Sequence, residues 1–172
     1  MSRLDSFIRR LEAQRACLDL AIALIGPVAG PVLELGLGNG RTYDHLRANL
    51  PNRAIYVFDR RIAVHPECVP EPAFFIEGDV VATLANSAAR LPGPAAMVHC
   101  DIGTGDRDAN AALAATIAPL IDHLMAERGI VVSDQRMEAP GWHKVPLPEG
   151  VAEGRYNIRR VERGPSNRSA AC

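Results

Sequence analysis

Residues 32–40 read Val-Leu-Glu-Leu-Gly-Leu-Gly-Asn-Gly, and this stretch decides the fold class. An apolar run ends in three glycines at alternate positions, Gly36, Gly38 and Gly40, and a helix-forming segment begins at Arg41. A strand, a glycine turn and a helix in this order bring bare backbone to the carboxyl end of a strand, where α/β sheets bind nucleotide-like ligands. Glycine suits such a turn because it accepts positive φ and has no Cβ to hold a ligand away.

Two further apolar runs lead to acidic residues with the spacing of a nucleotide site. Residues 55–59 end in Asp59, nineteen positions after Gly40. An acid about 20 residues beyond the glycine turn is where a second strand presents a carboxylate to ribose hydroxyls. Residues 73–77 form a third run, which leads into Gly78-Asp79-Val80. We therefore expect three strand ends to converge on one ligand.

The spacing of the glycines separates two classes of ligand. A dinucleotide fingerprint has the form G-x-G-x-x-G, whereas here position 41 is Arg and the third glycine comes one residue early. The pattern E-x-G-x-G-x-G from Glu34 to Gly40 instead resembles the first motif of class I S-adenosylmethionine-dependent methyltransferases. The alternative is a Rossmann-type domain for another ligand, for which Asp59 and Asp79 would be coincidences.

The resemblance implies that S-adenosylmethionine is the cofactor and that the chain transfers a methyl group. It implies that Glu34 helps to hold the methionine portion and that Asp79 accepts from the adenine amino group. The cofactor contacts that it implies lie at the ends of four strands: Glu34, Leu35, Gly36, Gly38, Asn39, Gly40, Thr42, Asp59, Arg60, Gly78, Asp79, Val80 and Asp101.

The periodicity of the rest of the chain predicts an α/β domain that covers residues 1–172. Within it, residues 1–29 hold an N-terminal helix over about 4–25, and residues 164–172 form a loose tail. Arg15 falls on the apolar stripe of this helix. Either its stem lies along the seam with the charge in water, or the helix covers the cofactor and Arg15 meets a carboxylate. The later elements expected are a strand at 96–101, a helix at 108–128, a strand at 129–134, a short strand near Val145 and an edge strand at 156–161.

These elements indicate a three-layer sandwich in which helices flank a doubly wound, mostly parallel sheet of about six or seven strands. At 172 residues the chain fits one domain. The net charge of −1 gives no general electrostatic case for a nucleic-acid partner. The four cysteines form no C-x-x-C pair, no apolar run reaches about 18 residues, and no signal-peptide layout is present. We therefore expect a cytoplasmic protein with reduced thiols and no membrane partner.

The ends of the fourth and fifth strands suggest the acceptor side of the site. Asp101, with Asp134-Gln135, is similar to the Asp…Asp-Asn arrangement of catechol-type O-methyltransferases, which implies a Mg²⁺ ion. Gln135 stands where Asn is usual, and no lysine follows Asp101 within the next turn. We therefore favour a cleft without a metal. His99 alternates with Asp101 on one strand, so these two are the candidate catalytic residues, with His99 either a general base or simply hydrogen-bonded in place.

The sequence thus predicts a methyltransferase that acts on a small-molecule acceptor, because no acceptor domain is inserted between the strands. The sequence leaves open the alternative that a second copy of the chain, in a homo-oligomer, completes the site. Two rival classes also remain: a non-catalytic S-adenosylmethionine-binding protein, and a dinucleotide-dependent oxidoreductase.

Overall fold

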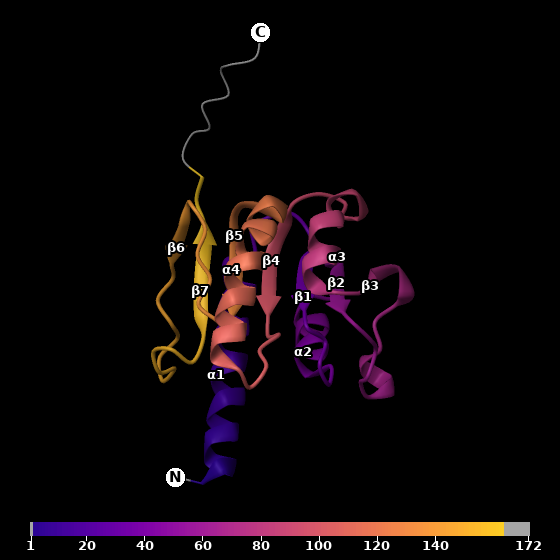
Figure 1. The fold of residues 1–172 in the computed structure, drawn as a ribbon. Helices are drawn as coiled ribbons and strands as arrows, with labels where there is room; N and C mark the ends of the chain where they lie inside the picture. Colours follow the sequence, from indigo (N-terminus) through magenta and orange to yellow (C-terminus); the bar gives the residue numbers. More distant parts are fainter. Residues whose placement is uncertain (1, 164–172) are drawn as a thin grey trace.

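The computed structural model describes residues 2–163, so the predicted tail at 164–172 lies outside the described residues. A seven-stranded sheet with the order β3-β2-β1-β4-β5-β7-β6 forms the middle layer (Figure 1). Its parallel part has five strands, β1 Val32–Leu35, β2 Ile55–Asp59, β3 Phe75–Glu77, β4 Ala95–Cys100 and β5 Met125–Ser133. Two antiparallel strands follow at one edge, β7 Asn157–Val161 against β5 and β6 Trp142–Lys144 against β7. The predicted doubly wound, mostly parallel sheet is confirmed.

Helices cover both faces of the sheet and divide the core into two layers. α1 Arg3–Leu24 and α2 Arg41–Asn49 pack on one face, and α3 Val80–Asn86 and α4 Arg107–Leu124 pack on the other. Short 3-10 turns lie at Pro66–Cys68, Pro72–Phe74 and Ala88–Arg90. Side-chain caps define the helix starts: Ser2 and Asp5 form a capping box on α1, and Asp79 and Asp106 cap α3 and α4.

The central strands are buried on both faces, which explains their near-continuous apolar sequence. β1 and β4 are buried along their whole length. The polar exceptions in these two strands are Glu34 and His99, which lie opposite one another in the register of the β1–β4 pair. A parallel sheet thus brings two ionisable side chains together in its centre.

Several predicted boundaries are wrong for identifiable reasons. The predicted helix at 108–128 ends at Leu124, and β5 starts at Met125 rather than at 129. Arg128, with φ 63°, and Gly129 mark an irregularity in the pairing of β5 with β4 instead of a helix end. β3 starts at Phe75 because Pro72 begins a 3-10 turn before it. The predicted edge strand, β7, is internal because β6 pairs with its outer side.

The first half of α1 projects beyond the ends of the parallel strands (Figure 1). Its apolar stripe was expected in the core, but Leu4, Phe7 and Ile8 are 66%, 47% and 44% exposed. Burial begins at Ala13, where the helix lies on the sheet. Among residues 2–163, no helix combines the length and apolar character that a membrane span requires. The projecting half of α1 instead forms a wall beside the carboxyl ends of the strands.

Candidate cofactor site and active site

A cavity of about 250 Å³ lies at the carboxyl ends of β1 and β4. The glycine turn from Gly36 to Asn39 and the start of α2 form one side, and the segment after β4 forms another. α1 covers it with Phe7, Arg10, Leu11 and Gln14. Ligands of open α/β sheets bind at this edge. A larger open groove of about 580 Å³ lies near the amino ends of the same strands, around Gly30, Arg53 and Pro94, and no acidic side chain lines it. The smaller cavity, which Asp101 lines, is therefore the candidate ligand site.

The glycine turn has the geometry that its sequence predicts. Gly36 has φ 89°, and a Cβ there would lie 2.7 Å from the carbonyl oxygen of Asp101. Gly38 has φ 53°, and a Cβ there would have no atom within 4 Å. Gly36 is therefore required for the close approach of β1 to the segment after β4, whereas Gly38 leaves the backbone open towards the cavity.

Asp59 connects the end of β2 to the glycine turn. Its Oδ2 accepts from the backbone N–H of Leu37 at 2.7 Å and of Gly38 at 3.3 Å. Its Oδ1 accepts from the N–H of Arg61 at 3.3 Å. The second acid of the predicted motif thus lies next to the turn, and it fixes the conformation of the turn.

The third predicted motif lies outside the lining of the cavity. Asp79 caps α3 by accepting from the N–H of Val81 at 3.0 Å and of Ala82 at 3.4 Å, and it pairs with Arg60 at 3.2 Å. The hydrogen bond from Ala82 is the largest of the effects that hold the pKa of Asp79 below its usual range. Its side chain is half exposed, so it remains open to a ligand that extends along the strand ends.

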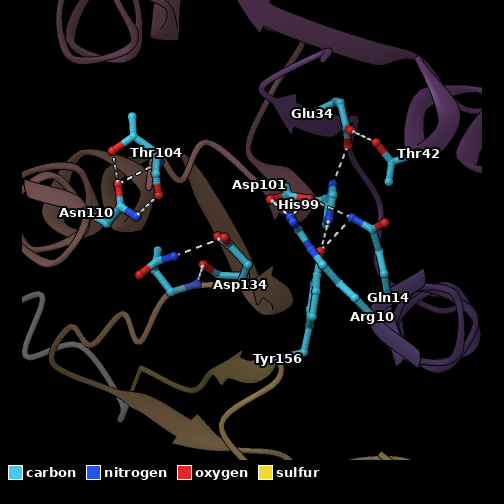
Figure 2. A network of polar contacts seen from close by, with 12 residues as sticks. Arg10, Gln14, Glu34, Thr42, His99, Asp101, Thr104, Asn110, Asp134 and Tyr156 are labelled. Carbon is cyan, nitrogen blue, oxygen red and sulfur yellow. Dashed lines mark hydrogen bonds and ion pairs between the residues drawn. The ribbon is translucent and has the colours of Figure 1, made fainter. Parts of the chain in front are cut away.

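Glu34 lies beneath the cavity instead of at its surface. The side chain is fully buried, and its carboxylate accepts from the Thr42 hydroxyl and from Nδ1–H of His99, the latter at 2.7 Å (Figure 2). Glu34 itself therefore does not line the cavity, whereas Thr42, its hydrogen-bond partner, does. Leu35 is also fully buried, and Gly40 packs against Cys68. Neither of these two residues lines the cavity.

His99 does not reach the cavity. It is fully buried, with Nδ1 on Glu34 and Nε2 3.2 Å from the hydroxyl of Tyr156. Burial disfavours the charged imidazolium, but the Glu34 carboxylate raises the pKa of His99 above its ordinary value. A general base needs a ring nitrogen within reach of the acceptor, and both nitrogens of His99 are engaged inside the protein. The geometry therefore favours the alternative that His99 is hydrogen-bonded in place.

Asp101 lines the cavity, as expected from its position at the end of β4. The Arg10 guanidinium lies 2.9 and 3.2 Å from its two oxygens, and Gln14 Nε2 donates to Oδ2 at 2.8 Å. Arg15, by contrast, is exposed. The N-terminal helix does bring an arginine to a carboxylate at the site, but the residue is Arg10. Arg10 and Gln14 are four positions apart and so share a helix face with the cavity-lining Phe7 and Leu11, a signal that was present in the sequence.

Asp134 lies behind Asp101 at the end of β5. Its Oδ2 accepts from Nε2 of Gln135 at 3.0 Å, and its buried Oδ1 has no hydrogen-bond partner among the described residues. Burial and the neighbouring Asp101 carboxylate raise the pKa of Asp134 to about 6. Asn110, in the first turn of α4, holds the loop that joins β4 to α4. Its Oδ1 accepts from the backbone N–H of Thr104 at 2.7 Å (Figure 2).

The donor set does not fit the Mg²⁺ ion that the catechol-type resemblance implies. Both oxygens of Asp101 accept from Arg10 or Gln14, so a cation would have to displace a guanidinium. Within residues 2–163, no group of three or more His, Cys, Asp or Glu side chains could hold a metal ion.

The buried carboxylate of Asp134, one oxygen of which has no partner among the described residues, predicts a pH-dependent cost to stability. Its pKa is raised from 3.8 to about 6 in the folded state. The folded state thus binds this proton more tightly, and stability is lost as the pH rises from about 4 through about 6. Asp134→Asn should raise Tm by a few degrees at pH 7.5 and change it little at pH 4, as followed by circular dichroism. Asp44→Asn, at an exposed acid of α2, is the control. Parallel Tm-against-pH curves for wild type and Asp134→Asn would contradict the prediction.

Comparisons with known proteins agree with this geometry. The sequence model of a family described as S-adenosyl-L-methionine methyltransferase matches residues 1–161. The chain is 46% identical to an S-adenosyl-L-methionine methyl transferase from Silicibacter pomeroyi DSS-3, over 94% of this chain and 99% of that chain, with a TM-score of 0.88. No curated protein matches the sequence.

More distant structures share the fold alone. One is a TDP-rhamnose 3′-O-methyltransferase of calicheamicin biosynthesis, with 19% identity over 92% of this chain and 81% of that one and a TM-score of 0.60. Another is a Methanococcus jannaschii fibrillarin pre-rRNA processing protein, with 13% identity over 78% and 67% and a TM-score of 0.52. The family match covers nearly the whole of the described chain. This chain belongs to the S-adenosyl-L-methionine methyltransferase family.

Proposed function

We propose that this methyltransferase binds S-adenosylmethionine in the cavity at the ends of β1 and β4 and transfers its methyl group to a small-molecule acceptor. The observation that carries the proposal is a cavity covered by α1 and lined by the glycine turn and Asp101, with Asp59 bonded to that turn from the end of β2. Backbone from Gly36 to Asn39 would lie beneath the cofactor, and Asp59 would accept from the ribose hydroxyls. Gly78-Asp79-Val80 and Arg60 would border the adenine.

The charges at the cavity suit a cationic cofactor. The sulfonium and ammonium groups of S-adenosylmethionine are positive, and carboxylates stabilise such groups where water is excluded. Asp101 is the acid that lines the cavity, and its charge is shared with Arg10 and Gln14. Methyl transfer is an in-line displacement with sulfur as the leaving group, so the protein mainly has to position the two reactants. We propose that Asp101 faces the reacting groups. His99 would support it indirectly from the buried side, through Tyr156 and Gln14.

Electrostatics support a small acceptor over a nucleic acid. Phosphate groups bind where Lys and Arg side chains are free to neutralise them. Of the two arginines that line the cavity, Arg10 is paired with Asp101 and Arg41 lies over the Phe7 ring, while Asp134 adds a second acid beside Asp101. The distant relatives include one that acts on a TDP-sugar and one of pre-rRNA processing, so the fold leaves the choice open. We also infer a cytoplasmic location, which the free thiols Cys17, Cys68 and Cys100 support.

Isothermal titration calorimetry of the purified protein tests the proposal. We expect S-adenosylmethionine and S-adenosylhomocysteine to bind with one site per chain, because both present the same nucleoside to the glycine turn. NAD is the control, because its pyrophosphate needs the later third glycine of a dinucleotide turn. Absence of heat with both sulfur compounds would overturn the proposal. Binding without methyl transfer to any of a panel of phenols, carboxylates and amines would favour the non-catalytic binder.

A further inference from the structure

A buried chain of hydrogen bonds crosses the layer between the sheet and α1 (Figure 2). Glu34 and His99 are fully buried, Tyr156 is 1% exposed and Gln14 is 7% exposed. The four residues come from β1, β4, the turn before β7 and α1. Buried polar groups are costly unless each has a partner. A layer of apolar side chains would fill this space without that requirement, so the polar chain calls for an explanation.

The links of the chain are continuous. Glu34 accepts from Nδ1–H of His99 at 2.7 Å, and Nε2 of His99 lies 3.2 Å from the Tyr156 hydroxyl. Gln14 Nε2 carries two hydrogens and donates to the Tyr156 oxygen at 2.7 Å and to Asp101 Oδ2 at 2.8 Å. Burial raises the pKa of Tyr156, so its hydroxyl remains protonated.

Both ends of this chain reach the cofactor cavity, although its middle does not. At one end Glu34 holds the hydroxyl of Thr42, and at the other Gln14 holds Asp101; Thr42, Gln14 and Asp101 all line the cavity. Tyr156 is outside the lining. The other partner of Asp101, Arg10, is about half exposed. An exposed ion pair contributes at most about 1 kcal/mol, so Arg10 alone would hold the Asp101 carboxylate weakly.

We propose that Tyr156 is a positioning residue for the cofactor, which acts through Gln14 to fix the Asp101 carboxylate at the cavity. The turn that leads into β7 is then part of the cofactor site, although Tyr156 does not line the cavity. This inference rests on the proposed function. It predicts that removal of the Tyr156 hydroxyl, which lies outside the cavity lining, weakens cofactor binding.

The test compares binding of S-adenosylhomocysteine to wild type, Tyr156→Phe and Tyr43→Phe by calorimetry. Tyr43 is a matched control, because it is also buried, at 6% exposure, but its ring lies beside Arg47 and away from the cavity. We expect Tyr156→Phe to raise Kd about tenfold, the effect of one buried hydrogen bond, and Tyr43→Phe to change it less than about twofold. Gln14→Leu removes this link together with the direct hydrogen bond to Asp101, so it should raise Kd at least as much as Tyr156→Phe.

A double-mutant cycle separates positioning from general destabilisation. If Tyr156 acts through Asp101, Tyr156→Phe should change Kd less than about twofold when Asp101→Asn is already present. An equal tenfold effect in both backgrounds would overturn the inference, as would a Kd for Tyr156→Phe no higher than that for Tyr43→Phe. Failure of wild type to bind S-adenosylhomocysteine would instead overturn the proposed function, so the two failures are distinct.

Discussion

Gly36→Ala is expected to lower the free energy of unfolding by about 2–5 kcal/mol. Gly36 has φ 89°, which an alanine adopts only with strain, and its Cβ would lie 2.7 Å from both the Asp101 carbonyl oxygen and Ile102 Cγ2. The Asp101 carbonyl cannot move easily, because the N–H of Asp101 donates to the Leu35 carbonyl at 3.1 Å. Urea denaturation followed by circular dichroism measures the loss.

Gly38→Ala is the matched control for this effect. It adds the same methyl group two residues later, at φ 53°, where no atom lies within 4 Å of the Cβ position. We expect a loss of about 1 kcal/mol, from the left-handed conformation alone. Its methyl group would project into the open space beside the turn, so its main effect should be on cofactor affinity. Equal losses of stability for the two variants would show that steric contact with Asp101 is not the reason for glycine at position 36.

Asp59→Ala is expected to weaken binding of S-adenosylhomocysteine by about 1.5–3 kcal/mol, roughly 10- to 150-fold in Kd. The carboxylate holds the N–H groups of Leu37 and Gly38, and we propose that it also accepts from the ribose hydroxyls. Its removal would loosen the turn and take away a charged acceptor. Calorimetry with S-adenosylhomocysteine measures the change.

Two variants show whether the effect belongs to the carboxylate. Asp59→Asn keeps one oxygen acceptor of similar shape, so it should lie between wild type and Asp59→Ala. Asp44→Ala removes an exposed acid that pairs with Arg47 on α2, away from the cavity, and should leave the affinity unchanged. An unaltered Kd for Asp59→Ala would mean that the end of β2 does not contact the cofactor.

The strand ends were predictable because their signals are local. An apolar run that ends in glycine or an acid marks where a strand leaves the sheet, and β1 and β2 have the predicted bounds. Boundaries failed where pairing with a neighbour outweighed the local pattern. Arg128-Gly129 has the composition of a helix end, but the pairing of Met125 with Ala95 extends β5 back to residue 125.

The candidate site was predictable in part. The sequence indicated that Glu34, Asp59, Asp101 and Asp134 lie at or near the ends of parallel strands. It did not indicate which of these carboxylates face a ligand. Glu34 is buried against His99, Asp59 holds the glycine turn, and Asp101 alone of the four lines the cavity. The orientation of each side chain depends on which neighbour donates to it, and those neighbours come from other elements.

By itself, the sequence determined the α/β class, the parallel core of the sheet and the class of cofactor, because glycine conformation, apolar periodicity and strand-end acids act over a few residues each. Only the tertiary structure decided that Arg10 and Gln14, rather than Arg15, meet Asp101 at the cavity, and that Tyr156 supports the site from behind. Gln14 and Tyr156 are 142 positions apart, yet they share a hydrogen bond of 2.7 Å. Contacts of that kind follow from how the layers pack, and no local pattern specifies them.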